Sequence, residues 1–203
     1  MPVTDLNSPE YEFSSCILFL LQQPGPGLSD LSPEHAAQLQ AWLPPGGSPS
    51  PSAWEEVYRA TTHGFGAAAF HERCDRRARL LVLVRAQEGG WLFGGFTAVG
   101  FSPPHGKKPD PSAFLFSLTN SLGRPEKLDS KRTGVDLYYD ISYSATFGLG
   151  PCDLRICNIA DIRAGSYTDT GHAFTASAST GAHPMAQGEQ EGWKAAEVVA
   201  WVV

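Results

Sequence analysis

Two apolar runs separated by a glycine pair form the clearest pattern in the chain. Residues 80–84 read Leu-Leu-Val-Leu-Val and residues 91–96 read Trp-Leu-Phe-Gly-Gly-Phe, with Glu88, Gly89 and Gly90 between them. Branched and aromatic side chains suit a pleated, buried surface, and the glycine pair allows the positive φ angles of a tight hairpin. A second doublet, 94–95, interrupts the later run, which is typical of a bulge or of a close approach between backbones. The pattern predicts a β-hairpin.

Strand-like periodicity continues from residue 79 to the C-terminus. We expect strands in the ranges 79–86, 91–99, 113–119, 134–141, 153–159 and 193–203. Because no helical pattern separates these strands, antiparallel pairing is expected, and a two-layer sandwich buries their two-sided apolar runs economically. The predicted class is mainly β (α+β): a two-layer antiparallel β-sandwich with a few short peripheral helices, mostly N-terminal.

The N-terminal quarter of the chain divides into two parts. Ser32 and Pro33 are typical of a helix start, and apolar residues 39, 42 and 43 lie on one face of the predicted short helix. Prolines, glycines and serines dominate residues 44–52, a composition that opposes helix and strand and is typical of a linker. We therefore predict an N-terminal appendage at 1–43, a linker at 44–52 and a β-sandwich domain at 53–203.

Two more helical patterns follow the predicted linker. Ser52 and Glu55 match the capping-box spacing, and three apolar residues, Trp54, Val57 and Tyr58, recur at helical spacing. An alanine-rich stretch at 66–73 predicts a further helix. We expect the aromatic residues of these helices in the core rather than against a cofactor.

Composition and charge narrow the function classes. The chain has 15 basic and 21 acidic residues among 203, a net charge of −6, which opposes binding to nucleic acid or anionic lipid. The apolar run at 16–21 is too short for a membrane span and follows acidic residues, so we expect neither signal peptide nor membrane insertion. The four cysteines, at 16, 74, 152 and 157, show no disulfide framework. Free thiols and a cytoplasmic location are expected.

Candidate chemistry is sparse. His71 and Cys74 lie at i and i+3 on a predicted helix and could bind a metal or activate a thiolate, but no second pair completes four ligands. Cys152 and Cys157 are an odd number of residues apart on a predicted strand, so they point to opposite faces. The other histidines are scattered, and surface positions are expected for histidine in this chain. We predict no catalytic residues, no metal and no cofactor.

Several short segments in collinear order resemble a TLD (TLDc) domain. These segments are 54–60, 64–75, 113–118, 147–150 with 153–156, and 196–198, and the similarity runs from about Trp54 to the C-terminus. The resemblance implies a β-sandwich with a few peripheral helices. It also marks family-motif positions that we expect to be structural: Phe93, Gly94, Gly95, Phe114, Phe116, Phe147, Gly148, Asp153 and Glu197. Glu197 has apolar neighbours in its strand, and an outward position is expected for it.

The same resemblance carries the functional expectation. It implies a non-enzymatic protein-interaction module, similar to oxidation-resistance-type proteins, that protects against oxidative stress and binds or regulates the vacuolar proton-pumping ATPase. The densest basic cluster, Arg73, Arg76, Arg77 and Arg79, is either a solvated turn or a surface for an acidic partner.

Two alternatives stay open. One is a structural component of a cytoskeletal or ciliary assembly, anchored by the helix at 31–43. The other is a peroxide-detoxifying enzyme that uses Cys74 with His71, which would require an exposed thiol of depressed pKa.

Overall fold

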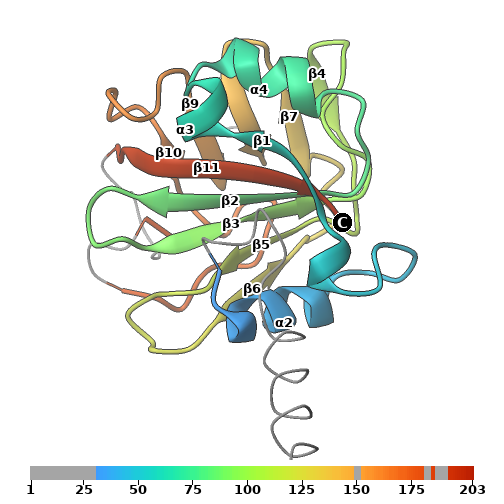
Figure 1. The fold of residues 1–203 in the computed structure, drawn as a ribbon, viewed down its shortest axis with the longest axis vertical. Coiled ribbons are helices and arrows are strands. Elements are labelled where there is room, and N and C mark those ends of the chain that lie inside the picture. Colours follow the sequence, from blue (N-terminus) through green and yellow to red (C-terminus); the bar gives the residue numbers. More distant parts are fainter. Residues whose placement is uncertain (1–30, 149–151, 181–183, 186–191) are drawn as a thin grey trace, which may run out of the picture.

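The computed structural model describes residues 31–148, 152–180, 184–185 and 192–203. Within these ranges, the strands form two antiparallel sheets (Figure 1). The first sheet has the order β1 (Glu55–Arg59), β11 (Ala195–Val202), β2 (Leu80–Ala86), β3 (Leu92–Thr97), β5 (Phe114–Ser117) and β6 (Glu126–Asp129). The second has the order β10 (Tyr167–Thr168), β9 (Leu154–Cys157), β8 (Tyr143–Phe147), β7 (Leu137–Tyr139) and β4 (Gly106–Lys108). The helical elements are short: α2 (Pro33–Trp42), η1 (Pro51–Ala53), α3 (Ala60–His63) and α4 (Ala67–Cys74). The predicted fold class is confirmed.

The hairpin predicted from the glycine pair is present. β2 and β3 pair antiparallel, and Gly89 and Gly90 between them adopt φ angles of 68° and 61°. Glycine adopts such angles without the steric penalty of a Cβ atom. Each of the six predicted strand ranges contains a strand, and the observed strands are shorter at their ends.

Both faces of the first sheet are buried, which explains its unbroken apolar runs. Val82 and Val84 of β2 pack between the two sheets, in a cluster that also contains Phe147 of β8. Leu81 and Leu83 point to the opposite face, in a second cluster. When both faces of a sheet are buried, successive side chains of a strand are all apolar, so the usual alternation of apolar and polar residues is absent.

Helix α2 covers the outer face of the first sheet (Figure 1). The side chain of Ser32 accepts a hydrogen bond from the His35 amide at 3.2 Å, so the predicted cap is present. Leu39 is fully buried in the second cluster, which also contains residues of β2. The following segment, 44–52, contacts the sheet through Arg79, whose guanidinium donates to the carbonyl of Pro44 at 2.8 Å. The division into appendage, linker and domain stays a prediction, and α2 itself is packed on the sheet.

The helix predicted at residues 52–58 is wrong. Pro51–Ala53 form a single 3₁₀ turn, and β1 follows and pairs with β11. The pairing shifts register between Glu56 and Tyr58, which is a β-bulge. The extra residue places Trp54 and Tyr58 on opposite faces, in the second and first clusters respectively. An apolar spacing that resembled a helix is therefore produced by a bulged strand.

Four strands carried no clear signal in the sequence. β4, β6 and β10 lie at sheet edges, where polar sequences such as Gly-Lys-Lys and Glu-Lys-Leu-Asp are tolerated. β8 is internal, but its small and polar residues Ser144, Ala145 and Thr146 weaken the pattern, although all three are buried.

Two expectations concern the N-terminal apolar run and membrane insertion. The apolar run 16–21 and Cys16 lie outside the described residues. None of the helices in the described ranges combines the length and the apolar character that crossing a membrane requires.

Candidate functional site

The glycine doublet of β3 lies where both faces of the first sheet are tightly packed. A Cβ atom at Gly95 would lie 2.7 Å from the ring of Phe147 and 2.9 Å from Leu115. A Cβ atom at Gly94 would overlap the carbonyl oxygen of Val82 and approach the ring of Phe116 at 2.9 Å. The doublet makes room for aromatic rings on both sides of the sheet, which is a packing role.

The four motif phenylalanines are all fully buried. Phe93 and Phe147 belong to the cluster between the sheets, and Phe114 and Phe116 to the cluster under α2. Their rings make edge and tilted contacts with other aromatic residues, such as Phe93 with Trp193 at a centroid separation of 5.0 Å. These residues stabilise the sandwich through burial of large apolar surfaces.

Asp153 organises the loop after β10. Its buried carboxylate accepts backbone hydrogen bonds from four consecutive residues: Gly171 (3.0 Å), His172 (3.0 Å), Ala173 (2.8 Å) and Phe174 (3.3 Å). Burial raises the pKa of the Asp153 carboxyl, while the four N–H donors act in the opposite direction. Gly148, with φ of 78°, lies directly against this carboxylate, where a side chain would collide with it. Gly148 and Asp153 therefore form a loop anchor.

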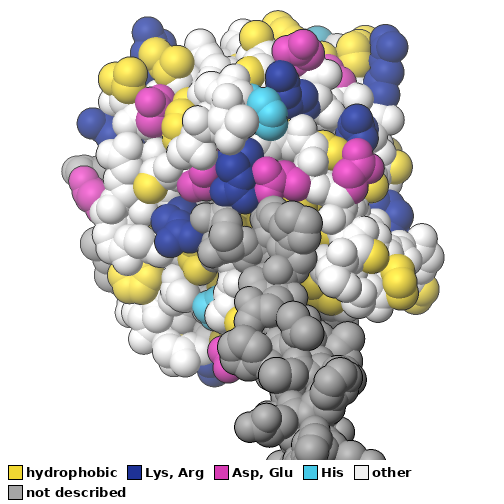
Figure 2. Space-filling view, viewed as in Figure 1, with side chains coloured by type: hydrophobic (Ala, Val, Ile, Leu, Met, Phe, Trp, Pro, Cys, Tyr) yellow, Lys and Arg dark blue, Asp and Glu magenta, His cyan; other side chains and the backbone are white. Residues whose placement is uncertain are grey.

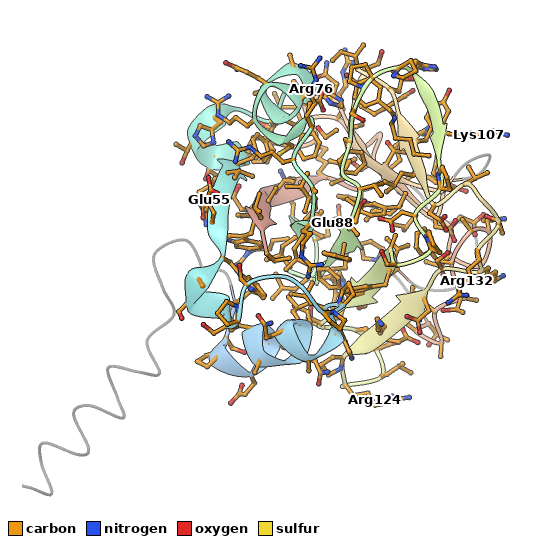
Figure 3. All side chains as sticks on the ribbon, turned by 90° about the vertical axis from the view of Figure 1, so that its right-hand side faces the viewer. Glu55, Arg76, Glu88, Lys107, Arg124 and Arg132 are labelled. Carbon is orange, nitrogen blue, oxygen red and sulfur yellow. The ribbon has the colours of Figure 1, made fainter. Side chains whose placement is uncertain are left out.

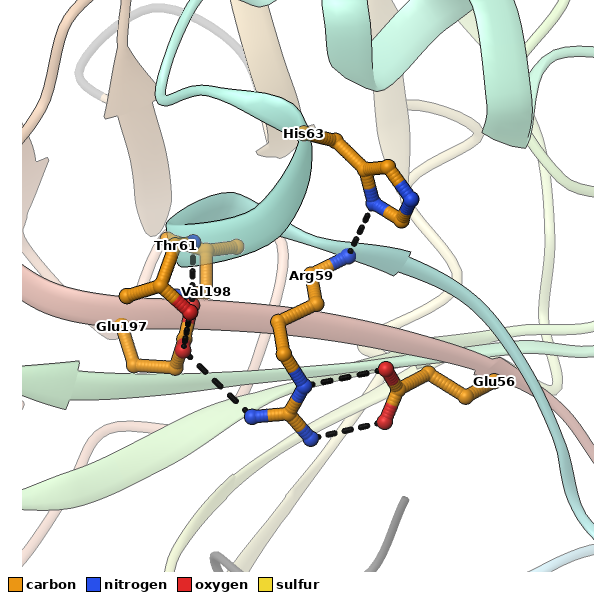
Figure 4. Close-up of polar contacts among 6 residues, drawn as sticks. All are labelled: Glu56, Arg59, Thr61, His63, Glu197 and Val198. Atoms are coloured by element: carbon orange, nitrogen blue, oxygen red, sulfur yellow. Dashed lines mark hydrogen bonds and ion pairs between the residues drawn. The ribbon is translucent and has the colours of Figure 1, made fainter. Parts of the chain in front are cut away.

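Glu197 is the centre of a polar network that joins β11, β1 and α3 (Figure 4). Its carboxylate accepts from the backbone N–H of Thr61 at 3.1 Å and from the Thr61 hydroxyl at 2.5 Å. Arg59 reaches it at 3.4 Å and binds Glu56 through two hydrogen bonds of 2.9 and 2.7 Å. The Arg59 amide donates to Nδ1 of His63 at 3.0 Å, so the neutral ring carries its proton on Nε2.

The position of Glu197 corrects the expectation of an outward strand residue. Residues 60–63 cover the side chain, and Glu197 is only 8% exposed. Two carboxylates share one guanidinium here, and each oxygen of Glu197 has a donor. The polar network therefore holds α3 on the first sheet. The face that contains β1 and β11 shows acidic and basic side chains interspersed rather than a patch of one sign (Figure 2).

Comparison with known proteins decides the family. A sequence model of the TLDc domain matches residues 30–198, which is most of the chain. The chain belongs to the TLDc family. No curated protein matches it. The match begins at the residue before the described N-terminal region, so it includes α2, and it ends within β11.

The arginine-rich turn of this TLDc domain separates into two kinds of residue. Arg79 is half-buried: it donates to the carbonyl of Val203 at 2.9 Å and lies 5.6 Å from the centroid of the Phe96 ring. Arg73 is half-buried beside Glu72, at 2.9 Å. Arg76 and Arg77 are exposed, and Arg77 contacts Glu55 at 3.3 Å. Figure 3 shows Arg76 at the α4 end of the molecule, far from Arg124. Of the predicted cluster, Arg76 and Arg77 are the residues that a partner can reach.

His71 and Cys74 of this TLDc domain are both buried on α4. The predicted helix is present as α4, but its His71 is buried, which corrects the expectation of a surface histidine. The Nδ1 atom of His71 contacts Asp75 at 2.7 Å, and Nε2 contacts the carbonyl of Tyr143 at 2.7 Å. Cys74 is fully buried, and burial raises the pKa of its thiol. In the described ranges, no group of three or more His, Cys, Asp or Glu side chains could hold a metal ion.

A surface hollow beside β8 and β9 is a feature that the sequence did not single out. Its volume is about 400 Å³, and its lining residues are Ser142, Tyr143, Arg155, Cys157, Asn158, Arg163 and Gly165. Arg155 stands between the buried residues Leu154 and Ile156 of β9, which places it on the outer face of the second sheet. The alternation of apolar and polar residues around Arg155 is the sequence pattern that could have indicated its outward position.

Proposed function

We propose that this TLDc domain is a non-enzymatic protein-interaction module that protects against oxidative stress by binding and regulating the vacuolar proton-pumping ATPase. The observation that carries the proposal is the family match over residues 30–198. Fold membership by itself does not specify a function, so the proposal depends on the role that the family resemblance implies.

The packing of the motif residues supports an interaction role. The motif phenylalanines, the glycine doublet, Asp153 and Glu197 all serve the core or anchor loops. Surface loops and turns are then the parts that can contact a partner without disturbing the sandwich. Among them, Arg76 and Arg77 offer two exposed positive charges at the end of α4. We propose that an acidic protein surface binds there.

The charge of the chain supports a protein partner over nucleic acid or anionic lipid. With 21 acidic and 15 basic residues, the net charge of −6 weakens association with nucleic acid and with anionic lipid. We propose a cytoplasmic domain that reaches a membrane only through the assembly that it binds.

The two alternatives have less support. A peroxidase would need an accessible thiolate at Cys74, whereas this thiol is buried with a raised pKa. An anchor helix at 31–43 would need a free apolar face, whereas Leu39 of α2 is buried against the first sheet.

Affinity purification with cross-linking tests the proposal. The tagged full chain is cross-linked in its own cells, and the captured proteins and linked residues are identified by mass spectrometry. Recovery of vacuolar ATPase subunits is expected, with a large reduction for the double variant Arg76→Glu and Arg77→Glu. Arg124→Glu is the matched control, because Arg124 is exposed at the opposite end of the molecule (Figure 3). Recovery of only cytoskeletal or ciliary proteins would refute the proposal in favour of a structural component.

A further inference from the structure

The hollow beside β8 and β9 has the charge of an anion-binding site. Two of its seven lining residues are arginines, Arg155 and Arg163, and none is acidic. Within the part of the chain that the structure describes, neither guanidinium has a carboxylate partner, and Nε of Arg155 is buried without a hydrogen-bond acceptor. A buried donor without an acceptor costs free energy, and an anion bound beside the same guanidinium would offset part of that cost.

Arg155 is held in place by aromatic rings. Its guanidinium carbon lies 4.8 Å from the centroid of the Tyr143 ring and 6.0 Å from that of Tyr167. Tyr143 is in turn held by α4, because its carbonyl contacts Nε2 of the buried His71 at 2.7 Å. A guanidinium stacked on aromatic faces is held in one orientation, so its terminal NH₂ groups can bind a planar anion with little loss of entropy.

The remaining lining residues add polar donors. The Oδ1 atom of Asn158 accepts from the Ala67 amide at 2.9 Å, which orients the side chain and leaves its NH₂ group as a donor. Ser142 is exposed at the hollow, and its side chain also hydrogen-bonds to the Asp140 carboxylate. Three acidic residues lie two positions before a lining residue: Asp140, Asp153 and Asp161. Asp140 accepts from the Ser142 amide at 2.9 Å and contacts Nε2 of His105 at 3.3 Å, and Asp153 is bound to the backbone of the loop after β10. The hollow therefore presents donors and positive charge on an acidic chain.

Two exposed apolar residues are sequence neighbours of residues that line the hollow. In the described ranges, the large apolar residues with high exposure are Val99 (50%), Ile141 (58%) and Ile162 (67%). Ile141 directly precedes Ser142 and Ile162 directly precedes Arg163, so two of the three adjoin lining residues. Exposed apolar residues next to a charged hollow are typical of a protein-binding site, in which apolar contacts exclude water from a central polar contact.

We propose that this hollow binds an acidic side chain, Asp or Glu, of a partner polypeptide whose neighbouring apolar residues cover Ile141 and Ile162. The net charge of −6 favours one local carboxylate over a polyanion such as nucleic acid or an anionic membrane, because an extended negative charge is repelled by the rest of the chain. The inference rests on the proposed function, since it names a second contact region on the same interaction module. Tyr143 and His71 connect this region to α4, which ends before the exposed Arg76.

A peptide titration tests the hollow directly. The probe is a synthetic peptide with the sequence Gly-Ser-Leu-Glu-Leu-Ser-Gly and blocked ends, added to the isotope-labelled full chain and followed by NMR. The Nε–H signal of Arg155 and the amides of Cys157 and Asn158 should shift, and a peptide with Gln in place of Glu should bind at least about tenfold more weakly. Equal shifts with both peptides, or none at Arg155, would overturn the inference. Shifts with inorganic phosphate but not with the Glu peptide would overturn it in favour of a small-anion site.

Matched variants separate a binding role from a folding role. Arg155→Gln and Arg163→Gln should each weaken the Glu peptide by about tenfold, and the exposed Arg163 can be changed with little effect on packing. Arg124→Gln and Val99→Ser are the controls for charge and apolar surface, and Ile162→Ser should weaken binding where Val99→Ser does not. Unchanged affinity in both arginine variants would contradict the inference.

The outcome is distinguishable from that of the proposed function. If the wild-type chain captures vacuolar ATPase subunits and Arg163→Gln captures them equally, while the peptide causes no shifts, the hollow is not the contact and the proposed function stands. If the peptide binds as expected but no ATPase subunit is captured, the hollow is supported and the proposed partner is wrong.

Discussion

The polar network around Glu197 leads to a quantitative prediction for the substitution Glu197→Gln. The amide keeps the shape of the carboxylate, and its oxygen can still accept from the Thr61 backbone N–H. Its NH₂ group then takes the place of the oxygen that faces the Thr61 hydroxyl and NH1 of Arg59. The Thr61 hydroxyl can rotate and accept a hydrogen bond from this NH₂ group. The Arg59 guanidinium can only donate, so the NH₂ group and the guanidinium face each other as two donors.

The expected loss follows from these contacts. A hydrogen bond to a charged group contributes about 1.5–3 kcal/mol and a neutral one about 0.5–1.5 kcal/mol, so weakening of the two Thr61 bonds costs about 2–3 kcal/mol in total. The 3.4 Å pair with Arg59 adds less than about 1 kcal/mol, because the guanidinium is already bound to Glu56 through two shorter hydrogen bonds. We expect the free energy of unfolding to fall by about 3 kcal/mol, and the Tm by about 6–12 °C for a domain of this size.

Urea unfolding followed by tryptophan fluorescence measures this loss. Glu55→Gln is the matched control: it lies on β1, is exposed and has one contact with Arg77 at 3.3 Å, so its effect should stay within about 0.5 kcal/mol. A double-mutant cycle with Thr61→Val should give a coupling of about 1 kcal/mol. If Glu197→Gln costs no more than Glu55→Gln, the network does not hold α3 on the sheet and the reasoning is refuted.

Three further predictions concern packing and titration. Gly95→Ala should destabilise the domain by about 1–3 kcal/mol in the same unfolding assay, because the added methyl lies 2.7 Å from the Phe147 ring, and a neutral effect would contradict tight packing between the sheets. Leu39→Ala should cost about 2–5 kcal/mol, since this fully buried side chain fixes α2 to the first sheet, and a cost below about 1 kcal/mol would mean that the helix detaches freely. Burial acts to raise the pKa of Asp140, but hydrogen bonds from its neighbours, including His105, outweigh it and hold that pKa below its usual value. Its contribution to stability is therefore present above the unfolded pKa, about 3.9, and is lost as the pH falls through the lower folded pKa. His105→Gln should raise the pKa of Asp140 in an NMR titration, and an unchanged value would disprove the pairing.

The strands that sequence reasoning found are those with strong apolar runs. β2, β3, β5, β7, β9 and β11 all contain buried apolar residues in a row or in alternation. Edge strands such as β4 are short and polar, so local pattern carries little information about them. For β1 the local pattern was misleading, because a bulge between Glu56 and Tyr58 gives its apolar residues a spacing like that of a helix.

Sequence reasoning likewise identified some features of the candidate sites and missed others. The family-motif residues could be found because their segments follow one another in the expected order. The burial of Glu197 could not, because α3 covers it from 136 residues away in the sequence, through Thr61. The hollow could not either, since Ser142, Arg155 and Arg163 come from separate segments and become neighbours only when β8 pairs with β9.

The amino-acid sequence by itself determined the fold class of this domain: side-chain periodicity and the glycine pair at 89–90 are local properties, and they specify strands, a hairpin and hence an antiparallel β-sandwich. Only the tertiary structure decided which charges are buried, which are paired and which stay open to a partner. Those outcomes depend on contacts between residues far apart in the chain, such as Arg79 with Val203, and no local pattern encodes them.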